Sequence, residues 1–172
     1  NQMYEICLGL EHNLDVSIYS NLEFTWEQMS QIRLGLQNNL NISLYNRPEF
    51  SWEQMREIRY GLEAGLNVEP YLNSKFDFYQ MEQIRLGLEN KVDVSLYAKP
   101  EYNYDKMGQI YSGLRKGIDV SIYSNLEFNE WQMWKIREGL EQGLDVSIYA
   151  DRKFDYSQMR QIRLGLEKGL DV

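Results

Sequence analysis

The chain repeats itself every 26 residues, and this period constrains its fold more than any other feature. All seven methionines share one register, at Met3, Met29, Met55, Met81, Met107, Met133 and Met159. Isoleucine, glycine, leucine and tyrosine positions keep the same step, with no insertion anywhere. A period of roughly 20 to 50 residues is typical of repeat proteins, in which each repeat buries its apolar face only against its neighbours. We therefore predict an all-α solenoid of tandem repeats, each a long helix, a turn and a short helix.

The long helix is predicted from its cap and its apolar stripe. Ser51 and Gln54 have the spacing of a capping box, in which each side chain bonds the backbone N–H of the other. Met55, Ile58 and Leu62 follow at the spacing that places residues on one face of a helix. Other repeats carry side chains of the same capping type, namely Thr25, Asp77, Asn103, Asn129 and Asp155.

The end of the long helix and the start of the short one are also marked. Gly65 is predicted to take the left-handed conformation that ends the helix, and Asn67 to cap the short helix. Lys91 occupies the position of Gly65, so we expect it to be strained or differently capped. Gly61 is unfavourable inside a helix, which indicates close approach of the tyrosine-bearing short helix or the next long helix.

One repeat domain is predicted over residues 1–172. The repeats are 2–27, 28–53, 54–79, 80–105, 106–131 and 132–157, followed by a partial repeat, 158–172. Terminal repeats usually carry polar caps, and neither end does so here. The expectation is therefore a fragment of a longer array, or an array that associates end to end.

Composition favours a folded, cytoplasmic protein and argues against a nucleic-acid binder. Hydrophobic residues make up 43% of the chain, and no apolar run approaches the roughly 18 residues of a membrane span. Cys7 is the only cysteine, which excludes an internal disulfide and suggests a reducing compartment. The net charge of −8 disfavours a phosphate-binding surface. Residues 2–27 carry acidic groups and neither Lys nor Arg, while later repeats are nearly balanced, so the even ladder of a nucleic-acid mimic is missing.

Residues for catalysis are scarce. His12 lies at a variable position near a helix end, and Cys7 has no histidine to activate it. The sequence contains no zinc-ligand spacing, no phosphate-binding loop and no Ser-His-Asp set. We therefore predict a protein that is not an enzyme and that needs no cofactor or metal.

Two rows of side chains are the candidate binding residues. An arginine follows the buried isoleucine in five repeats. It is predicted either to bind carboxylates or phosphates along a groove, or to pair between repeats with an acidic residue such as Glu49 or Asp93 or with a helix-end carbonyl. Aromatic residues open the long helices and either pack on the neighbouring repeat or form an exposed ridge typical of interface hot spots. The arginines are Arg33, Arg59, Arg85, Arg137 and Arg163. The aromatic row is Trp26, Trp52, Phe78, Tyr104 and Tyr156, with Trp131 and Trp134 as irregular additions.

The repeat also resembles a known one. The pattern Gln-Met-x-Gln-Ile-Arg-x-Gly-Leu-Glu-x-Gly-Leu-Asp-Val-Ser-x-Tyr, clearest at 132–149 and 158–172, is similar to a repeat of bacterial mobile-element and phage proteins. The resemblance spans the whole chain and implies an accessory or host-interaction role. Proteins of such elements often oppose host defence by binding a nuclease, an effector or a signalling nucleotide.

Four functions follow from these observations. The leading hypothesis is a protein-binding solenoid that inhibits a host factor. The second is a site between repeats for a small anionic molecule such as a nucleotide signal. The others are a nucleic-acid mimic and a structural spacer or self-assembling filament.

Overall fold

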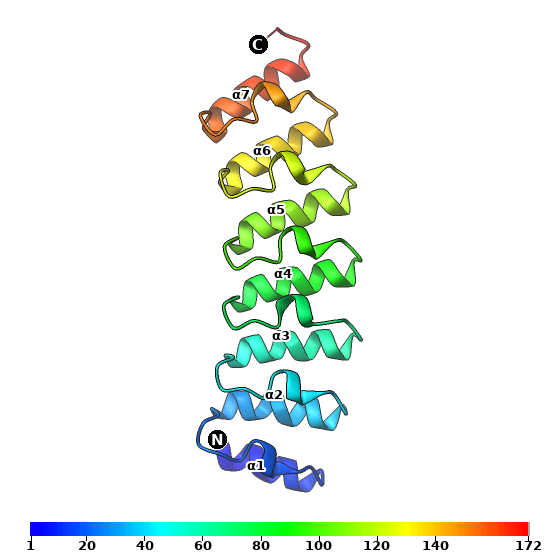
Figure 1. Cartoon of the computed structure of the whole chain (residues 1–172), viewed down its shortest axis with the longest axis vertical. Coiled ribbons are helices and arrows are strands. Elements are labelled where there is room, and N and C mark those ends of the chain that lie inside the picture. Colours follow the sequence, from blue (N-terminus) through cyan, green and yellow to red (C-terminus); the bar gives the residue numbers. More distant parts are fainter. Residues whose placement is uncertain (172) are drawn as a thin grey trace. The chain divides into compact units, whose positions relative to one another are not determined.

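A computed structural model of the chain describes residues 1–171. Over this range it is all-helical, with seven α-helices joined by single 3₁₀ turns and no β-strand (Figure 1). The long helices are α1 (Gln2–Glu11), α2 (Trp26–Gln37), α3 (Trp52–Glu63), α4 (Phe78–Glu89), α5 (Tyr104–Arg115), α6 (Glu130–Glu141) and α7 (Tyr156–Glu167). The 3₁₀ turns are η1 (Val16–Ile18), η2 (Ile42–Leu44), η3 (Glu69–Tyr71), η4 (Val94–Leu96), η5 (Val120–Ile122) and η6 (Val146–Ile148).

The chain forms two compact units, Asn1–Glu89 and a second that begins at Asn90. In the first unit α1 packs on α2, α2 on α3 and α3 on α4; in the second α5 packs on α6 and α6 on α7 (Figure 1). The 3₁₀ turns lie against the long helices, as η2 does against α2 and η6 against α6. The prediction of an all-α chain whose consecutive helices pack together is confirmed within each unit.

The helix starts are held as predicted. Ser51 Oγ accepts from the Gln54 amide N–H at 3.3 Å, and the Gln54 side chain accepts from the Ser51 N–H at 2.7 Å. The Gln54 side chain also donates forward to the carbonyls of Ser74 and Phe76. The capping glutamine therefore joins one repeat to the next, a second role that the capping pattern alone does not reveal.

The residue that ends a long helix has a left-handed backbone conformation, at Lys91 as well as at the glycines. Gly65 has φ +69°, and Lys91 has φ +57°. Lys91 is thus not differently capped: it takes the conformation of glycine, which a Cβ atom makes unfavourable.

The predicted short helices are single turns of three residues. Asp93 caps η4 and accepts from the N–H and hydroxyl of Ser95. These hydrogen bonds lower the pKa of Asp93. The prediction for Asn67 was wrong, because the N-cap of η3 is Val68 and Asn67 Oδ1 only accepts from the Glu69 N–H at 3.1 Å.

The glycine of the long helix makes room for the tyrosine of the same repeat. A Cβ atom on Gly61 would lie 1.9 Å from Tyr71 Oη, so only glycine fits there. Tyr71 is fully buried and donates to the Glu57 carbonyl at 3.4 Å. Close approach of the tyrosine-bearing turn, one of the two predicted neighbours, is confirmed. Burial raises the pKa of Tyr149 to about 12, and it also raises the pKa of Tyr45, Tyr71, Tyr97 and Tyr123.

The repeated methionines and isoleucines form the core between the helices. Met55 and Ile58 are fully buried, and Phe50, just before the cap of α3, is almost completely buried beside them. Met3 is the exception, with 69% of its surface exposed, because no described element covers that face of α1. The core is therefore assembled from the residues that recur with the 26-residue period.

Candidate functional site

The predicted arginines are held by hydrogen bonds and ion pairs within the chain. Arg59 shows the arrangement: its Nε donates to Gln31 Oε1 at 3.1 Å, 28 residues earlier, and its Nη1 lies 2.5 Å from Glu63 Oε1. Equivalent pairs hold Arg33 to Glu5 and Gln37, Arg85 to Glu57 and Glu89, and Arg137 to Gln109 and Glu141. These guanidinium groups link successive long helices.

The arginine row therefore makes contacts between repeats, one of its two predicted roles, but the predicted partners were wrong. Glu49 lies 3.8 Å from Arg47, and Asp93 caps the turn at Ser95. For Arg33, Arg59, Arg85 and Arg137 the partners lie 28 residues before and four residues after the arginine. Packing of consecutive helices brings the earlier partner close.

The contact between α6 and α7 departs from this arrangement. Lys135 takes the position of Gln31, so Arg163 Nε finds no hydrogen-bond partner among the described residues. Glu138 compensates: its carboxylate lies 2.8 Å from Lys135 Nζ and 3.5 Å from Arg163 Nη2. Four other repeats place a leucine at the position of Glu138, as at Leu34, and the remaining two carry Tyr60 and Ser112. Arg163 Nη1 is also paired with Glu167, so Glu138 is shared between the two largely buried cations, and Glu167 contributes a second carboxylate to Arg163.

The predicted aromatic row lies at the starts of the long helices, and most of it is exposed. The exposed members are Trp26, Tyr104, Trp131 and Tyr156, while Trp52, Phe78 and Trp134 are half-buried. Trp131 is 54% exposed, and its ring centroid lies 5.9 Å from that of Trp134 and 6.2 Å from that of Tyr156. The rings thus contact one another and still face solvent, which combines the two predicted alternatives.

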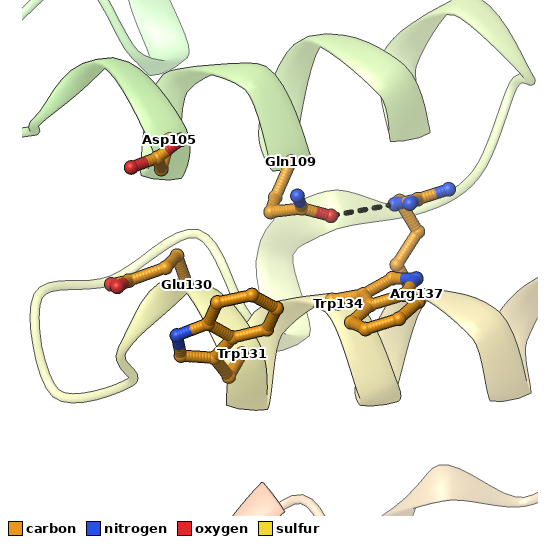
Figure 2. A pocket seen from close by; sticks show the side chains of 6 residues that line it. All are labelled: Asp105, Gln109, Glu130, Trp131, Trp134 and Arg137. Carbon is orange, nitrogen blue, oxygen red and sulfur yellow. Dashed lines mark hydrogen bonds between the residues drawn. The ribbon is translucent and has the colours of Figure 1, made fainter.

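Two of these tryptophans line a hollow between α5 and α6, about 320 Å³ in volume (Figure 2). α5 contributes Asp105 and Gln109; α6 contributes Glu130, Trp131, Trp134 and Arg137. The two tryptophans lie three residues apart on α6, a spacing that places side chains on the same side of a helix. In Figure 2 the hydrogen bond between Gln109 and Arg137 lies at one end of the hollow, and Asp105 and Glu130 lie at the other.

The end of the hollow near Asp105 and Glu130 is negatively charged. Within residues 1–171 neither carboxylate has a hydrogen bond or an ion pair. Both lie in the first turn of a helix. Although burial opposes ionisation, Lys116 and Arg137 hold the pKa of Glu141 below its ordinary value, so Glu141 balances the charge of Arg137. The uncompensated charge that faces the hollow is therefore acidic.

A hollow of similar chemistry lies between α2 and α3, in the other unit. It has a volume of about 280 Å³ and is lined by Trp26, Glu27, Ser30, Gln31 and Trp52. Glu27 and Gln31 stand three repeats before Asp105 and Gln109, in the same register. Glu27 also has no hydrogen bond or ion pair among the described residues. Tryptophan beside an unpaired carboxylate is thus a recurring combination.

The hollow between α6 and α7 differs in charge. Its volume is about 330 Å³, and its lining residues are Trp134, Lys135, Tyr156, Ser157, Arg160 and Gln161. Trp134 therefore lines a hollow on each side of α6. The charged side chains that line the α6/α7 hollow, Lys135 and Arg160, are both cations.

Reasoning from the sequence missed Asp105 and Glu130. One signal for them was available: Asp105 shares its register with Glu27, and Glu130 stands where most repeats have an aromatic residue. Which acids border the tryptophans depends on how neighbouring helices face each other, and a single repeat does not contain that information.

The fold and the site together define an all-α protein of helical-repeat type. When the chain is compared with known proteins, no family model, curated protein or solved structure matches it. None of the helices in residues 1–171 has the length and apolar character needed to span a membrane. The same residues contain no cluster of three or more His, Cys, Asp or Glu side chains suited to a metal ion.

Proposed function

We propose that the chain is a non-catalytic protein-binding module, built as an α-solenoid of 26-residue repeats. The observation that carries this proposal is the exposed tryptophan-lined hollow between α5 and α6. Trp and Tyr are enriched at interface hot spots, because a large ring buries much apolar area while ordering few rotatable bonds.

The contrast between recurring internal side chains and variable exposed ones supports this function. The polar residues that recur in most repeats are used inside the chain, as Gln54 and Arg59 are. The first turns of the long helices instead differ from repeat to repeat and leave large rings such as Trp131 exposed. A constant framework with a variable face is how repeat proteins present a specific surface to a partner.

A selection experiment tests the proposal. The full chain is immobilised and a displayed library of random peptides is selected on it, with the Trp131→Ala/Trp134→Ala variant as competitor in solution. Tyr4→Ala serves as the matched control, because Tyr4 is 65% exposed and lines none of these hollows. Circular dichroism confirms that each variant remains helical.

Binders should lose about thirtyfold in affinity for the double tryptophan variant, as truncation of a hot-spot ring predicts, and should bind Tyr4→Ala like the wild type. Two results would refute the proposal. Selection could recover no binder with saturable affinity, or the recovered binders could hold the double variant as tightly as the wild type.

The biological role that we propose is inhibition of a host factor, in line with the similarity of the repeat to those of mobile-element and phage proteins. The partner would then be a protein of the host cell. Co-expression with host proteins that bear the selected peptide sequences tests this role, and it fails if none forms a complex with the chain.

A second candidate is suggested by the cationic hollow between α6 and α7. Trp134 and Tyr156 offer rings for a nucleobase, and Arg160 has no hydrogen bond or ion pair in the described chain that would keep it from a phosphate. A thermal-shift series with nucleotides should show stabilisation that Arg160→Ala removes. A flat response to every nucleotide would end this candidate.

A further inference from the structure

We propose that the hollow between α5 and α6 binds an arginine side chain of a basic segment of a protein partner, an inference that rests on the protein-binding function proposed above. The guanidinium group would stack on the exposed ring of Trp131 and donate hydrogen bonds to the carboxylates of Asp105 and Glu130. The hollow combines an aromatic face and anionic acceptors, the two features that recognise a planar cation.

The ring that is available for stacking is that of Trp131. Trp134 already has an ammonium group on its ring, since Lys135 Nζ lies 3.7 Å from the ring centroid. This internal contact shows the same attraction between a cation and an indole within the chain. Trp131 has no such cation in the described residues and is more than half exposed. A guanidinium group is weakly hydrated and planar, so it loses less on stacking against an indole than an ammonium group does.

The charge that would attract the arginine is supplied by facing helices. Asp105 belongs to α5 and Glu130 to α6, and both line the same end of the hollow beside Trp131 (Figure 2). Neither carboxylate has a partner among residues 1–171. A guanidinium group has five N–H donors in a fixed fork, which allows one group to serve two carboxylates at once.

The cations near the hollow leave this charge in place. Arg137 is bound by Gln109 and Glu141, and Lys135 is paired with Glu138 at 2.8 Å. Lys106 follows Asp105 in sequence, but its ammonium group donates to the Leu126 carbonyl at 3.2 Å. Consecutive residues of a helix do not face each other, so Lys106 is not positioned to neutralise Asp105.

The hollow between α2 and α3 repeats this chemistry with Trp26, Trp52 and the unpaired Glu27. The acid keeps its register, since Glu27 corresponds to Asp105, whereas Trp26 and Trp52 stand at the positions of Tyr104 and Glu130, so the second hollow places its rings differently.

Tryptophan fluorescence provides the test. The chain has four tryptophans, so the Trp26→Phe/Trp52→Phe background leaves only Trp131 and Trp134, both of which line the α5/α6 hollow. The probe is a capped tetra-arginine peptide. Its matched control is tetra-citrulline, which keeps the shape of the side chain and lacks its charge, and tetra-lysine provides a cation without a planar group.

We expect tetra-arginine to change the emission saturably, and tetra-citrulline to have no effect. Asp105→Asn and Glu130→Gln should each weaken tetra-arginine about fivefold, the size of a partly exposed charge pair. Glu11→Gln/Glu23→Gln removes two negative charges, one more than either single variant, from exposed positions that line none of these hollows, and should still change the affinity little.

Four outcomes would overturn the inference: no saturable response, an equal response to tetra-citrulline, equal binding of tetra-lysine, or equal weakening by the Glu11/Glu23 control. The peptide selection separates this failure from failure of the proposed function. Binders that depend on Trp131 and Trp134 but lack arginine would leave the protein-binding function standing and refute the arginine site. The absence of any tryptophan-dependent binder would refute the function itself.

Discussion

Replacing Glu138 by leucine should lower the free energy of unfolding, because Lys135 at the contact between α6 and α7 would lose its carboxylate partner. Glu138 is the carboxylate that lies 2.8 Å from Lys135 Nζ and 3.5 Å from Arg163 Nη2. Leucine is compatible with the position, because other repeats carry it in the same register, at Leu34, Leu86 and Leu164. The substitution therefore removes charge from a site whose shape accepts the new side chain.

The expected loss of unfolding free energy lies between that of a surface pair and that of a buried pair. Breaking a fully buried pair costs about 3–5 kcal/mol, whereas an exposed pair contributes about 0–1 kcal/mol. The Lys135 and Arg163 side chains are only 6% and 10% exposed, but the Glu138 side chain is 26% exposed. We therefore expect Glu138→Leu to cost about 2 kcal/mol, because solvent at the carboxylate screens part of the interaction.

The cost should disappear when Lys135 is also changed to the glutamine of other repeats. A glutamine at this position accepts from the arginine of the next repeat, as Gln109 does from Arg137 Nε at 3.1 Å, so Arg163 Nε would gain its missing acceptor. Lys135→Gln alone should be neutral or stabilising by up to about 1 kcal/mol. Glu138→Leu should then cost less than about 0.5 kcal/mol in the Lys135→Gln background, which gives a coupling energy of about 1.5 kcal/mol or more.

Urea unfolding of the four proteins, followed by far-ultraviolet circular dichroism and by tryptophan fluorescence, measures this cycle. Coincident transitions of the two probes are required, since repeat arrays can unfold in parts. In thermal melts the loss corresponds to about 4–8 °C in Tm for a chain of this size. An equal cost of Glu138→Leu in both backgrounds would show that Glu138 does not stabilise through Lys135, and would refute the reasoning.

Three further predictions concern the framework. Gly61→Ala places a methyl group 1.9 Å from Tyr71 Oη, so urea unfolding should show a loss of about 2 kcal/mol, partly relieved by Tyr71→Phe. Lys91→Gly relaxes a left-handed residue and should stabilise by about 1 kcal/mol; an unchanged thermal midpoint would contradict this. Because burial raises their pKa, the buried tyrosines contribute stability that is complete below the ordinary tyrosine pKa and is lost as pH rises past it, up to about 12 for Tyr149. Each buried tyrosine should lower the unfolding free energy by about 1.4 kcal/mol for each pH unit above about 10. Tyrosinate absorbance and the loss of helical circular dichroism should therefore rise together in an alkaline titration. Complete ionisation of the tyrosines with the helices intact would contradict this prediction.

The contact between α6 and α7 shows that a residue of one repeat cannot always be replaced by another type without a second change nearby. The position of Lys135 is glutamine or glutamate in the other repeats whose arginine it supports, as at Gln31 and Glu57. A cation there leaves Arg163 Nε unpaired, and a compensating acid is present at Glu138. At this contact the change at Lys135 is thus accompanied by the acid at Glu138, whereas Trp131 is exposed and has no such buried charge to balance.

Much of the fold could be read from the sequence because its signals are local. A capping box such as Ser51 and Gln54 and a left-handed residue such as Gly65 act within one or two turns of backbone, and the structure contains both. The glycine of the long helix also indicated a close neighbour, and Tyr71 is that neighbour. Hydrogen bonds over three or four residues leave few alternatives, so these features follow from sequence alone.

The contacts between repeats were decided only by the tertiary structure. The partner of Arg59 lies 28 residues earlier, and no local rule selects it over other acidic or amide side chains. In the same way, Asp105 became part of a candidate site only because α5 faces Trp131 of α6 across a hollow. The periodic sequence determines which residues each helix buries, while the distance and rotation between packed helices determine which side chains meet, and those depend on the interlocking of whole surfaces.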